Sequence, residues 1–467
     1  MRTKIEYNNE TITFTDGGKI ELHCEGKKMA SDVVISVGQG SAINGIIKQY
    51  KVNAGASVSA GDFVEFVTKW NSGEFSDTTP NYVSACKLDN NRVLIAYSSQ
   101  TMSYQGNAVI LTIEDGEVSI GATKVFNAGY SGYISVAALS NSKVFVAYGG
   151  SSYGCARVLT IDGTDISTGE EKKFSSYTAS YISATALTDN KVVVVYREQF
   201  TNPRLMAEVF TVSGTTITLG GDIIVASAKY YVYVSATALT DSKGLIVWGD
   251  NSLSNVSLSS VCRAAVFVVD GTTIAIGGVV TISGEPTRNI LATVLTDGKV
   301  LVTYTRSTTD AEGTTTAQGF GQVLTINGST VLKGTETSVG NGSYPTSVKL
   351  TENKGIRFYG KYARVFTIDG TDITEGELYT LDTTATSLTN TKAIALSGSS
   401  VLLVCCDSGA AKYYFFEITD TTITLVNPEA SETQGTFVQP AVSNMYNVGV
   451  AKTSGAEGET VEVYCVP

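Results

Sequence analysis

The chain has 467 residues, which is more than one ordinary compact domain, so we expect several domains or one large ring- or barrel-like domain. Its 33 Lys and Arg against 44 Asp and Glu give a net charge of −11, which argues against nucleic acid or an anionic membrane as a partner. The single histidine, His23, excludes most histidine-based catalysis and histidine metal sites.

The N-terminal residues contain no apolar core of signal-peptide length, and no segment approaches the roughly 20 apolar residues of a membrane span. We therefore expect synthesis in a bacterial cytoplasm and no membrane insertion. The 7 cysteines are odd in number and show no C-x-x-C spacing. This pattern favours small buried side chains over a disulfide or metal framework, and no cofactor or metal is expected.

The first elements in the chain are short strands within residues 1–48, with a turn at Asp16–Gly18 and a Gly/Ser connector at 38–45. A β segment of this length is poorly stable alone. We interpret residues 1–48 as a small β arm or attachment module that docks on another part of the protein or on a partner.

An internal repeat follows, built on a hairpin with the turn pattern L-[ST]-[DN]-x-K. Eight copies occur 46 to 56 residues apart, anchored at Leu88, Leu139, Leu187, Leu239, Leu295, Leu350, Leu396 and Val442. After each of the first seven comes a second hairpin with D-G, N-G, S-G or a related tip, which suits a turn with positive φ. Four antiparallel strands at this period predict an all-β fold, a β-propeller.

The copy number favours eight four-stranded blades within a domain spanning 49–467, with seven as the alternative. The eighth copy, Pro440–Ala451, is degenerate and only one further strand follows it. The segment 58–70 is similar to the outermost strand at Gly220–Ala228, so we expect it to supply the missing strand. An N-terminal strand that closes the ring in this way removes two exposed sheet edges.

Strand alternation assigns the connections to two faces. The turns within hairpins are short and uniform, whereas the links between hairpins and between blades vary and are rich in Tyr, Ser, Gly and Asn, a composition typical of recognition surfaces. Tyrosines that recur in register, Tyr133, Tyr181 and Tyr233, are expected to pack in the fold. The candidate ligand-binding residues are the tyrosines outside this register, Tyr130, Tyr153, Tyr177, Tyr230 and Tyr231.

A family resemblance appears in the segments Gly26–Gly38 and Tyr50–Thr68 together with the repeats. This arrangement resembles tail and other virion proteins of phages that infect Gram-positive, gut-type bacteria, in which a similar G-x-x-V-x-A-G-D-F-V run leads into propeller repeats. The resemblance implies a virion protein, placed in a tail or tail fibre, that carries no catalytic residues. It also implies other virion proteins as partners through residues 1–48, and a homo-oligomer in the particle.

Catalytic patterns were sought and not found. Sialidase-type Asp boxes, Walker, G-x-S-x-G and H-E-x-x-H motifs are absent. Two turns, at Asp162–Asp165 and Asp369–Asp372, carry paired carboxylates, but one pair supplies too few oxygens for Ca²⁺. A lipoyl-type carrier would need a second half-motif around Lys27 and Lys28, and none is present.

Two main hypotheses of function result. In the first, the protein is a non-enzymatic virion protein whose loop face binds a glycan or protein on the host surface. In the second, it is an architectural virion or scaffold protein that contacts other proteins. A glycosidase or lyase remains a third, and would require two carboxylates about 5–10 Å apart near the ring axis.

Overall fold

The structure, a computed structural model, describes residues 72–425 except 115–116, 200, 202, 228–230, 251–260, 310–314, 341–344 and 382–387. It also describes strand segments at 4–7, 10–14, 20–24, 27–28, 33–35, 45–52, 63–68, 436–440, 448–451 and 460–465. Within these residues the molecule is built from strands, and no helix there is long and apolar enough to cross a bilayer. The sole helical element described is a 3-10 turn, η1 (Gln100–Met102).

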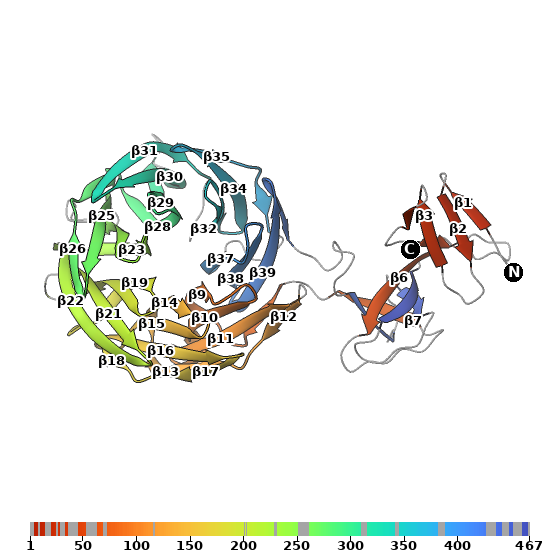
Figure 1. Ribbon diagram of the computed structural model, residues 1–467, viewed down its shortest axis with the longest axis horizontal. Helices are drawn as coiled ribbons and strands as arrows, with labels where there is room; N and C mark the ends of the chain where they lie inside the picture. Colours follow the sequence, from red (N-terminus) through yellow and green to blue (C-terminus); the bar gives the residue numbers. More distant parts are fainter. Residues whose placement is uncertain are drawn as a thin grey trace. The chain divides into compact units, whose positions relative to one another are not determined.

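Residues 72–425 form a β-propeller of seven antiparallel blades around a common axis (Figure 1). The innermost strands of blades 1 to 7 are, in order, β9 (Pro80–Lys87), β14 (Gly132–Ser140), β19 (Ala179–Thr188), β23 (Tyr231–Ala238), β28 (Thr287–Thr296), β32 (Thr346–Thr351) and β37 (Thr389–Ala395). Each contacts the innermost strand of the next blade, and β37 contacts β9. The ring is therefore closed with seven blades, the alternative count, and not eight.

The second and third strands of each blade form its centre. The second strands are β10 (Arg92–Ser99), β15 (Lys143–Gly149), β20 (Lys191–Glu198), β24 (Lys243–Asp250), β29 (Lys299–Thr309), β33 (Lys354–Tyr359) and β38 (Ser400–Asp407). The third strands are β11 (Gln105–Glu114), β16 (Gly154–Asp162), β21 (Arg204–Ser213), β25 (Val261–Asp270), β30 (Thr315–Asn327), β34 (Tyr362–Asp369) and β39 (Ala410–Thr419). Val192 to Val195 in β20 are all 0% exposed, because both faces of a blade pack against neighbouring blades. This explains the continuous apolar runs of the second strands.

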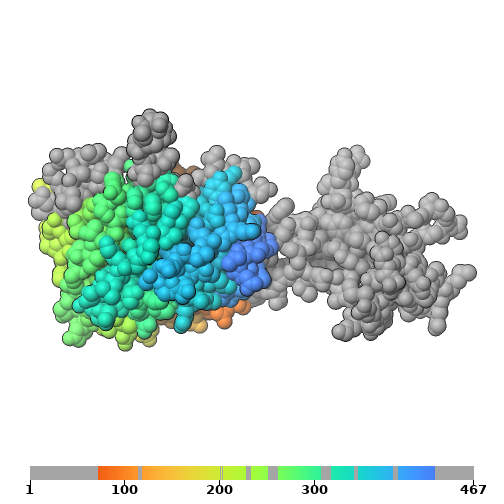
Figure 2. Space-filling view, turned by 90° about the horizontal axis from the view of Figure 1, so that it is seen from above, coloured from red at the N-terminus to blue at the C-terminus, as the bar shows by residue number. Residues whose placement is uncertain are grey.

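The outermost strand is interrupted in most blades. The outer strands are β12 (Glu117–Ile120) with β13 (Lys124–Tyr130), β17 (Asp165–Thr168) with β18 (Lys172–Lys173), β22 (Thr216–Ser227), β26 (Thr273–Ile276) with β27 (Val280–Ser283), β31 (Thr330–Ser338), and β35 (Asp372–Glu375) with β36 (Tyr379–Thr380). Figure 2 shows the later blades, coloured green to blue, side by side along the outside of the ring.

In blade 7 the two halves of the outer strand come from distant parts of the chain. The first half is β40 (Thr422–Leu425), and the second is β8 (Ser72–Ser76), which pairs antiparallel with β39. The prediction that an N-terminal strand closes the ring is thus confirmed, but its position is corrected. The predicted segment 58–70 contains β7 (Phe63–Thr68), which pairs instead with β41 (Thr436–Pro440) and β42 (Val448–Ala451).

Phe75 shows why β8 completes the ring. In blades 1 and 2 a phenylalanine of the outer strand packs against a tyrosine of the following blade, with ring centroids 5.4 Å apart for Phe126–Tyr148 and 4.9 Å for Phe174–Tyr196. Phe75 repeats this contact with Tyr97 of blade 1 at 5.5 Å. The Tyr97 hydroxyl donates a hydrogen bond to Ser76 Oγ at 2.9 Å.

The remaining strands form a second unit, described here by itself. One sheet consists of β1 (Lys4–Tyr7), β2 (Glu10–Phe14), β3 (Ile20–Cys24) and β4 (Lys27–Lys28). The other has the order β41-β7-β42-β43-β6-β5, where β43 is Thr460–Cys465, β6 is Gly45–Val52 and β5 is Val33–Ile35. The degenerate eighth repeat copy thus contributes to this sheet and not to a blade, since it brings too few strands for one.

The domain boundaries differ accordingly from the predicted 1–48 and 49–467. Contacts divide the chain into a propeller of 72–114 and 118–425 and a unit that contains 1–71 and 426–467. The sequence similarity of 60–70 to an outer strand did not distinguish pairing within a blade from pairing with the C-terminal strands.

Hydroxyl side chains join the innermost strands of adjacent blades. Ser135 Oγ accepts a hydrogen bond from the Ala184 N–H at 2.9 Å, and Ser183 Oγ accepts one from the Ala236 N–H at 2.9 Å. Equivalent bonds join Ser84 to Val136, Ser235 to Ala292, and Thr346 to Ala393. An innermost strand is a sheet edge with unpaired backbone groups, so each blade satisfies part of the next blade's edge.

Replacing Phe75 with Ala tests the ring closure. We expect the variant to lose about 3–5 kcal/mol of unfolding free energy, because the large buried side chain leaves a cavity at the junction of blades 7 and 1. Urea unfolding followed by tryptophan fluorescence measures the change. Phe126→Ala, the matched substitution between blades 1 and 2, should cost a similar amount, whereas an unchanged Phe75→Ala midpoint would contradict the closure.

Candidate ligand-binding site

Four tyrosines occupy the same register position in successive innermost strands, and all four have left-handed backbone conformations. The φ values are 49° for Tyr82, 51° for Tyr133, 49° for Tyr181 and 54° for Tyr233. At this point the pairing between the innermost and second strands shifts register in each blade, which marks a β-bulge. Bulges re-aim side chains and are frequent next to functional sites.

The left-handed backbone conformation costs more free energy for tyrosine than for asparagine. A non-glycine residue in the left-handed region is disfavoured by roughly 1–2 kcal/mol, and asparagine is among the residues that tolerate it best. Blades 5 and 7 have asparagines at the equivalent position, Asn289 with φ 51° and Asn390 with φ 50°. The bulge thus does not require an aromatic residue, which indicates that the tyrosine side chains themselves are used.

The four tyrosines form a continuous series of ring contacts, which we call the tyrosine arc (Tyr82, Tyr133, Tyr181 and Tyr233). Centroid distances are 4.9 Å for Tyr82–Tyr133, 5.1 Å for Tyr133–Tyr181 and 5.9 Å for Tyr181–Tyr233. All four side chains are partly exposed. At the start of the arc, Asn390 Oδ1 accepts a hydrogen bond from the Tyr82 N–H at 3.1 Å, which links blades 7 and 1.

The hydroxyls of Tyr82, Tyr133 and Tyr181 remain protonated over the physiological range. Burial raises the pKa of Tyr82, and interactions with the Tyr130 and Tyr133 side chains raise it further. Burial also raises the pKa of Tyr133 and Tyr181, partly opposed by the positive charge of Arg197. The hydroxyls are therefore neutral groups that can donate and accept hydrogen bonds.

The predicted binding residues divide into three groups. Tyr130 lies at the arc, with its ring 5.6 Å from that of Tyr104 and an interaction with the Tyr82 hydroxyl. Tyr153 and Tyr177 are 40% and 41% exposed, and the Lys173 ammonium lies 4.3 Å from the Tyr153 ring centroid. The side chains of Tyr230 and Tyr231 lie outside the described residues.

The in-register tyrosines were expected to pack in the fold, and Tyr133 and Tyr233 do pack against hydrophobic core clusters. They are in addition partly exposed, in contact with neighbouring tyrosines and in a left-handed backbone conformation, which the sequence pattern did not predict. Tyr82 was not singled out at all. The available signal was the asparagine at the same register in two copies, because asparagine is among the residues that adopt the left-handed conformation most readily.

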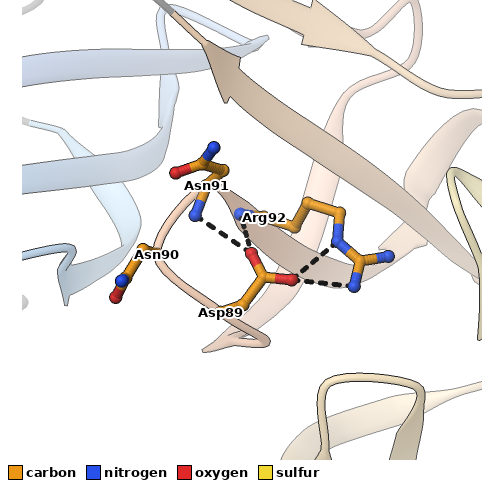
Figure 3. A pocket seen from close by; sticks show the side chains of 4 residues that line it. All are labelled: Asp89, Asn90, Asn91 and Arg92. Atoms are coloured by element: carbon orange, nitrogen blue, oxygen red, sulfur yellow. Dashed lines mark hydrogen bonds and ion pairs between the residues drawn. The ribbon is translucent and has the colours of Figure 1, made fainter.

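The opposite face, made of hairpin turns, is structural in character. Asp89, Asn90, Asn91 and Arg92 line a shallow open hollow at the first such turn (Figure 3). Partial burial would raise the pKa of Asp89, but hydrogen bonds from Arg92 and from the N–H groups of Asn91 and Arg92 outweigh it and lower the pKa. The Asp89 carboxylate therefore stabilises the turn in which it lies.

Arg92 also affects whether the paired carboxylates of the hairpin turns could bind Ca²⁺. Arg92 Nη1 donates to Gly163 O at 2.8 Å, in the turn Asp162–Asp165 of the next blade, and Lys299 Nζ donates to Gly370 O at 2.8 Å in the turn Asp369–Asp372. A cationic side chain therefore already lies at each turn. Among the residues that the structure describes, no cluster of three or more His, Cys, Asp or Glu could hold a metal ion.

Glu208 is a buried carboxyl on the third strand of blade 3, away from the innermost strands. Burial raises its pKa to about 8, assisted by the negative charges of Asp222 and Glu198 and opposed by Lys172. Its side chain is 4% exposed. Such a shift is frequent in catalytic acids, but also in structural networks.

In blades 2, 5 and 6 the residue at this register has a structural role. Arg157, Gln322 and Arg364 donate to the carbonyls of Gly169, Gly334 and Gly376 at 2.8, 2.7 and 2.6 Å. A protonated Glu208 is a hydrogen-bond donor like these residues, whereas a carboxylate is not.

Substitutions at Tyr181 test the backbone argument. Tyr181→Asn should change the unfolding free energy by no more than about 1 kcal/mol, since relief of the left-handed strain offsets the lost ring contacts. Tyr181→Val should cost about 1–3 kcal/mol, because a β-branched residue is poorly accommodated at positive φ. Urea denaturation of both variants provides the comparison, and equal stability of the two would contradict the assigned conformation.

The pH dependence of stability tests Glu208. Its folded-state pKa of about 8 exceeds the ordinary 4.5, so the neutral form is favoured by folding. The contribution is complete below pH 4.5 and is lost as the pH rises towards 8, with a slope of at most about 1.4 kcal/mol per pH unit. Glu208→Gln, which keeps a donor, should flatten this slope between pH 5 and 8; an identical profile in both proteins would refute the assignment.

Comparison with known proteins supports the fold without identifying a family. No family model and no curated protein matches the chain. Among solved structures, hydrazine synthase of Kuenenia stuttgartiensis is similar with a TM-score of 0.51 and 9% identity, covering 75% of this chain and 97% of that one. A protein of Lactobacillus plantarum has a TM-score of 0.46 and 11% identity, and the match covers 69% of this chain and 97% of that one. The NanB sialidase of Streptococcus pneumoniae has a TM-score of 0.46 and 10% identity, and the match covers 75% of this chain and 70% of that one. At these identities the likeness concerns the propeller fold alone.

Proposed function

We propose that the propeller is a non-enzymatic binding module that holds carbohydrate against the tyrosine arc. The observation that carries this proposal is the retention of four tyrosines in a conformation that asparagine adopts at lower cost in blades 5 and 7. Strained backbone conformations cluster at functional sites, so the left-handed tyrosines indicate a function more strongly than their exposure alone does.

The chemistry of the arc suits a sugar ligand. Aromatic rings offer flat apolar faces for the C–H faces of a pyranose, and their neutral hydroxyls supply directional hydrogen bonds. Successive rings about 5 to 6 Å apart present repeated contacts, which suits a polymer or a multivalent glycan better than a single small molecule.

The composition of the inner ring supports binding without catalysis. None of the seven innermost strands, as the structure describes them, contains Asp or Glu, so the paired carboxylates of a glycosidase are not present on those strands. The perturbed carboxyl of Glu208 lies on the third strand of blade 3 and not on an innermost strand.

The resemblance to phage tail proteins supplies a setting for this proposal. In a virion, the propeller would carry the arc towards a glycan on the bacterial surface, and the separate strand unit would contact other virion proteins. Purification of phage particles that contain the protein, followed by adsorption assays with and without added propeller, addresses this part independently of the binding site.

A glycan array with the full chain tests the binding proposal. We expect the wild type to bind a subset of bacterial surface glycans, and Tyr133→Asn with Tyr181→Asn to weaken that binding by about tenfold or more through loss of two stacking rings. Tyr153→Asn with Tyr177→Asn is the matched control at two exposed tyrosines outside the arc. If the control variant loses binding and the arc variant does not, the binding site lies on the loops and not on the tyrosine arc. Absence of glycan binding by the wild type would refute the proposal.

A further inference from the structure

Two tyrosines of blade 1 extend the tyrosine arc away from the ring axis. Tyr130 ends the outer strand β13 and Tyr104 directly precedes the third strand β11, whereas Tyr82 lies on the innermost strand β9 (Figure 1). The ring centroids of Tyr104 and Tyr130 are 5.6 Å apart, and the Tyr130 side chain interacts with those of Tyr82 and Tyr133. Both added side chains are partly exposed. The aromatic surface therefore continues from the inner ring to a loop beside the third strand.

A glycine makes room for Tyr130 at the start of the innermost strand of blade 2. A Cβ atom on Gly132 would lie 2.6 Å from the Tyr130 hydroxyl oxygen and 2.9 Å from Cε1 of its ring, which is too close for non-bonded atoms. The backbone itself does not require glycine here, because φ of Gly132 is outside the left-handed region. The residues before the left-handed position in blades 1, 3, 4, 5 and 7 are Asn81, Ser180, Val232, Arg288 and Thr389. Glycine at this position thus accommodates the Tyr130 ring.

Hydrogen bonds fix the two loops that carry these tyrosines. Asn127 Nδ2 donates to Tyr130 O at 3.2 Å and to Ser131 Oγ at 2.9 Å. The Ser131 N–H donates to Tyr104 O at 2.9 Å, which joins one loop to the other, and the Tyr104 N–H donates to Ser99 O at 2.9 Å. Side chains that are held in place before binding lose less conformational entropy when a ligand binds. The two rings are therefore preorganised as a binding surface.

Blade 2 has a tyrosine at the corresponding loop position without the same setting. Tyr153 directly precedes the third strand β16, as Tyr104 precedes β11, but its ring contacts the Lys173 ammonium, 4.3 Å from the centroid. Tyr104 has a left-handed φ of 62°, as the arc tyrosines do, whereas φ of Tyr153 is outside that region. Tyr104 therefore shares with the arc both its ring contacts and its disfavoured backbone conformation.

We propose that Tyr104 and Tyr130 are additional sugar-binding subsites, and that the ligand is a linear polysaccharide which runs from the tyrosine arc outward over blade 1. This inference rests on the proposed carbohydrate-binding function. It adds the linear form of the ligand and two residues that bind sugar units beyond those on the arc. Each further ring provides a stacking face and a hydroxyl, and contacts made along one chain reinforce one another because the first binding event holds the next unit nearby.

The experiment varies the length of the oligosaccharide. The probes are linear gluco-, galacto-, manno- and N-acetylglucosamine oligosaccharides of about two to eight units, added to the array, and calorimetry measures their affinity for the full chain. We expect at least one series to bind, with an affinity that increases with length. Tyr104→Asn, which suits the left-handed backbone, should lower the affinity for the longest members by about three- to tenfold and leave that for the shortest unchanged. Gly132→Ala, which displaces Tyr130 without removing a ring, should act in the same direction.

Tyr153→Asn is the matched control and should leave the affinity unchanged at every length. Thermal midpoints equal to that of the wild type confirm that the variants are folded. An affinity that does not increase with length, or binding only of single sugars and branched glycans on the array, would overturn the inference and leave the proposed function standing. It would also be overturned if Tyr104→Asn had no effect at any length, or weakened short and long members equally, as a purely structural role would. Failure to bind any glycan refutes the proposed function itself.

Discussion

The innermost strand of each blade is the constraint on which the rest of this structure depends. It is the edge of a four-stranded sheet, so its outward backbone groups need partners, and it must also lie close to two neighbouring blades. Serine and threonine hydroxyls of one blade accept hydrogen bonds from the backbone of the next, and a left-handed bulge turns the start of the innermost strand in blades 1 to 5 and 7. Stability of the ring and placement of the tyrosine arc thus arise from the same strand.

Closure of the ring also relies on a contact that is used between other blades. Blade 7 lacks the second half of its outer strand, and β8 provides it from the other end of the propeller sequence. Phe75 reproduces at this junction the phenylalanine–tyrosine contact that blades 1 and 2 make with the blades that follow them. Because the junction repeats an existing interface, one short strand is sufficient to bring the two ends of the ring together.

Much of the fold could be predicted from the sequence, because the repeat encodes it locally. Alternating residues, D-G and N-G tips and the anchor leucines identify four strands and their order in each blade. The blade number and the closing strand could not be predicted, since the segment 58–70 and the copy at 440–451 have strand patterns that suit more than one sheet. Their pairing with each other is a long-range choice that periodicity does not encode.

The candidate site was predicted less well for a different reason. Composition indicated the tyrosine-rich side of the ring, and Tyr130 lies at the arc. Recurrence in register was interpreted as packing, which the core contacts of Tyr133 and Tyr233 confirm. It did not reveal the bulge that also brings these side chains to the same level in successive blades. Backbone handedness is not visible in hydrophobic periodicity, and here it distinguishes Tyr133 and Tyr181 from ordinary core aromatics.

The central claim is that the left-handed tyrosines of the inner ring form the ligand-binding surface. A crystal structure of the full chain with an oligosaccharide that it binds tests this most directly. The expected result is ligand density over the rings of Tyr133 and Tyr181, with φ of both tyrosines near 50°. Ligand density confined to the loops around Tyr153 and Tyr177, or tyrosines with extended backbone in the inner ring, would contradict it.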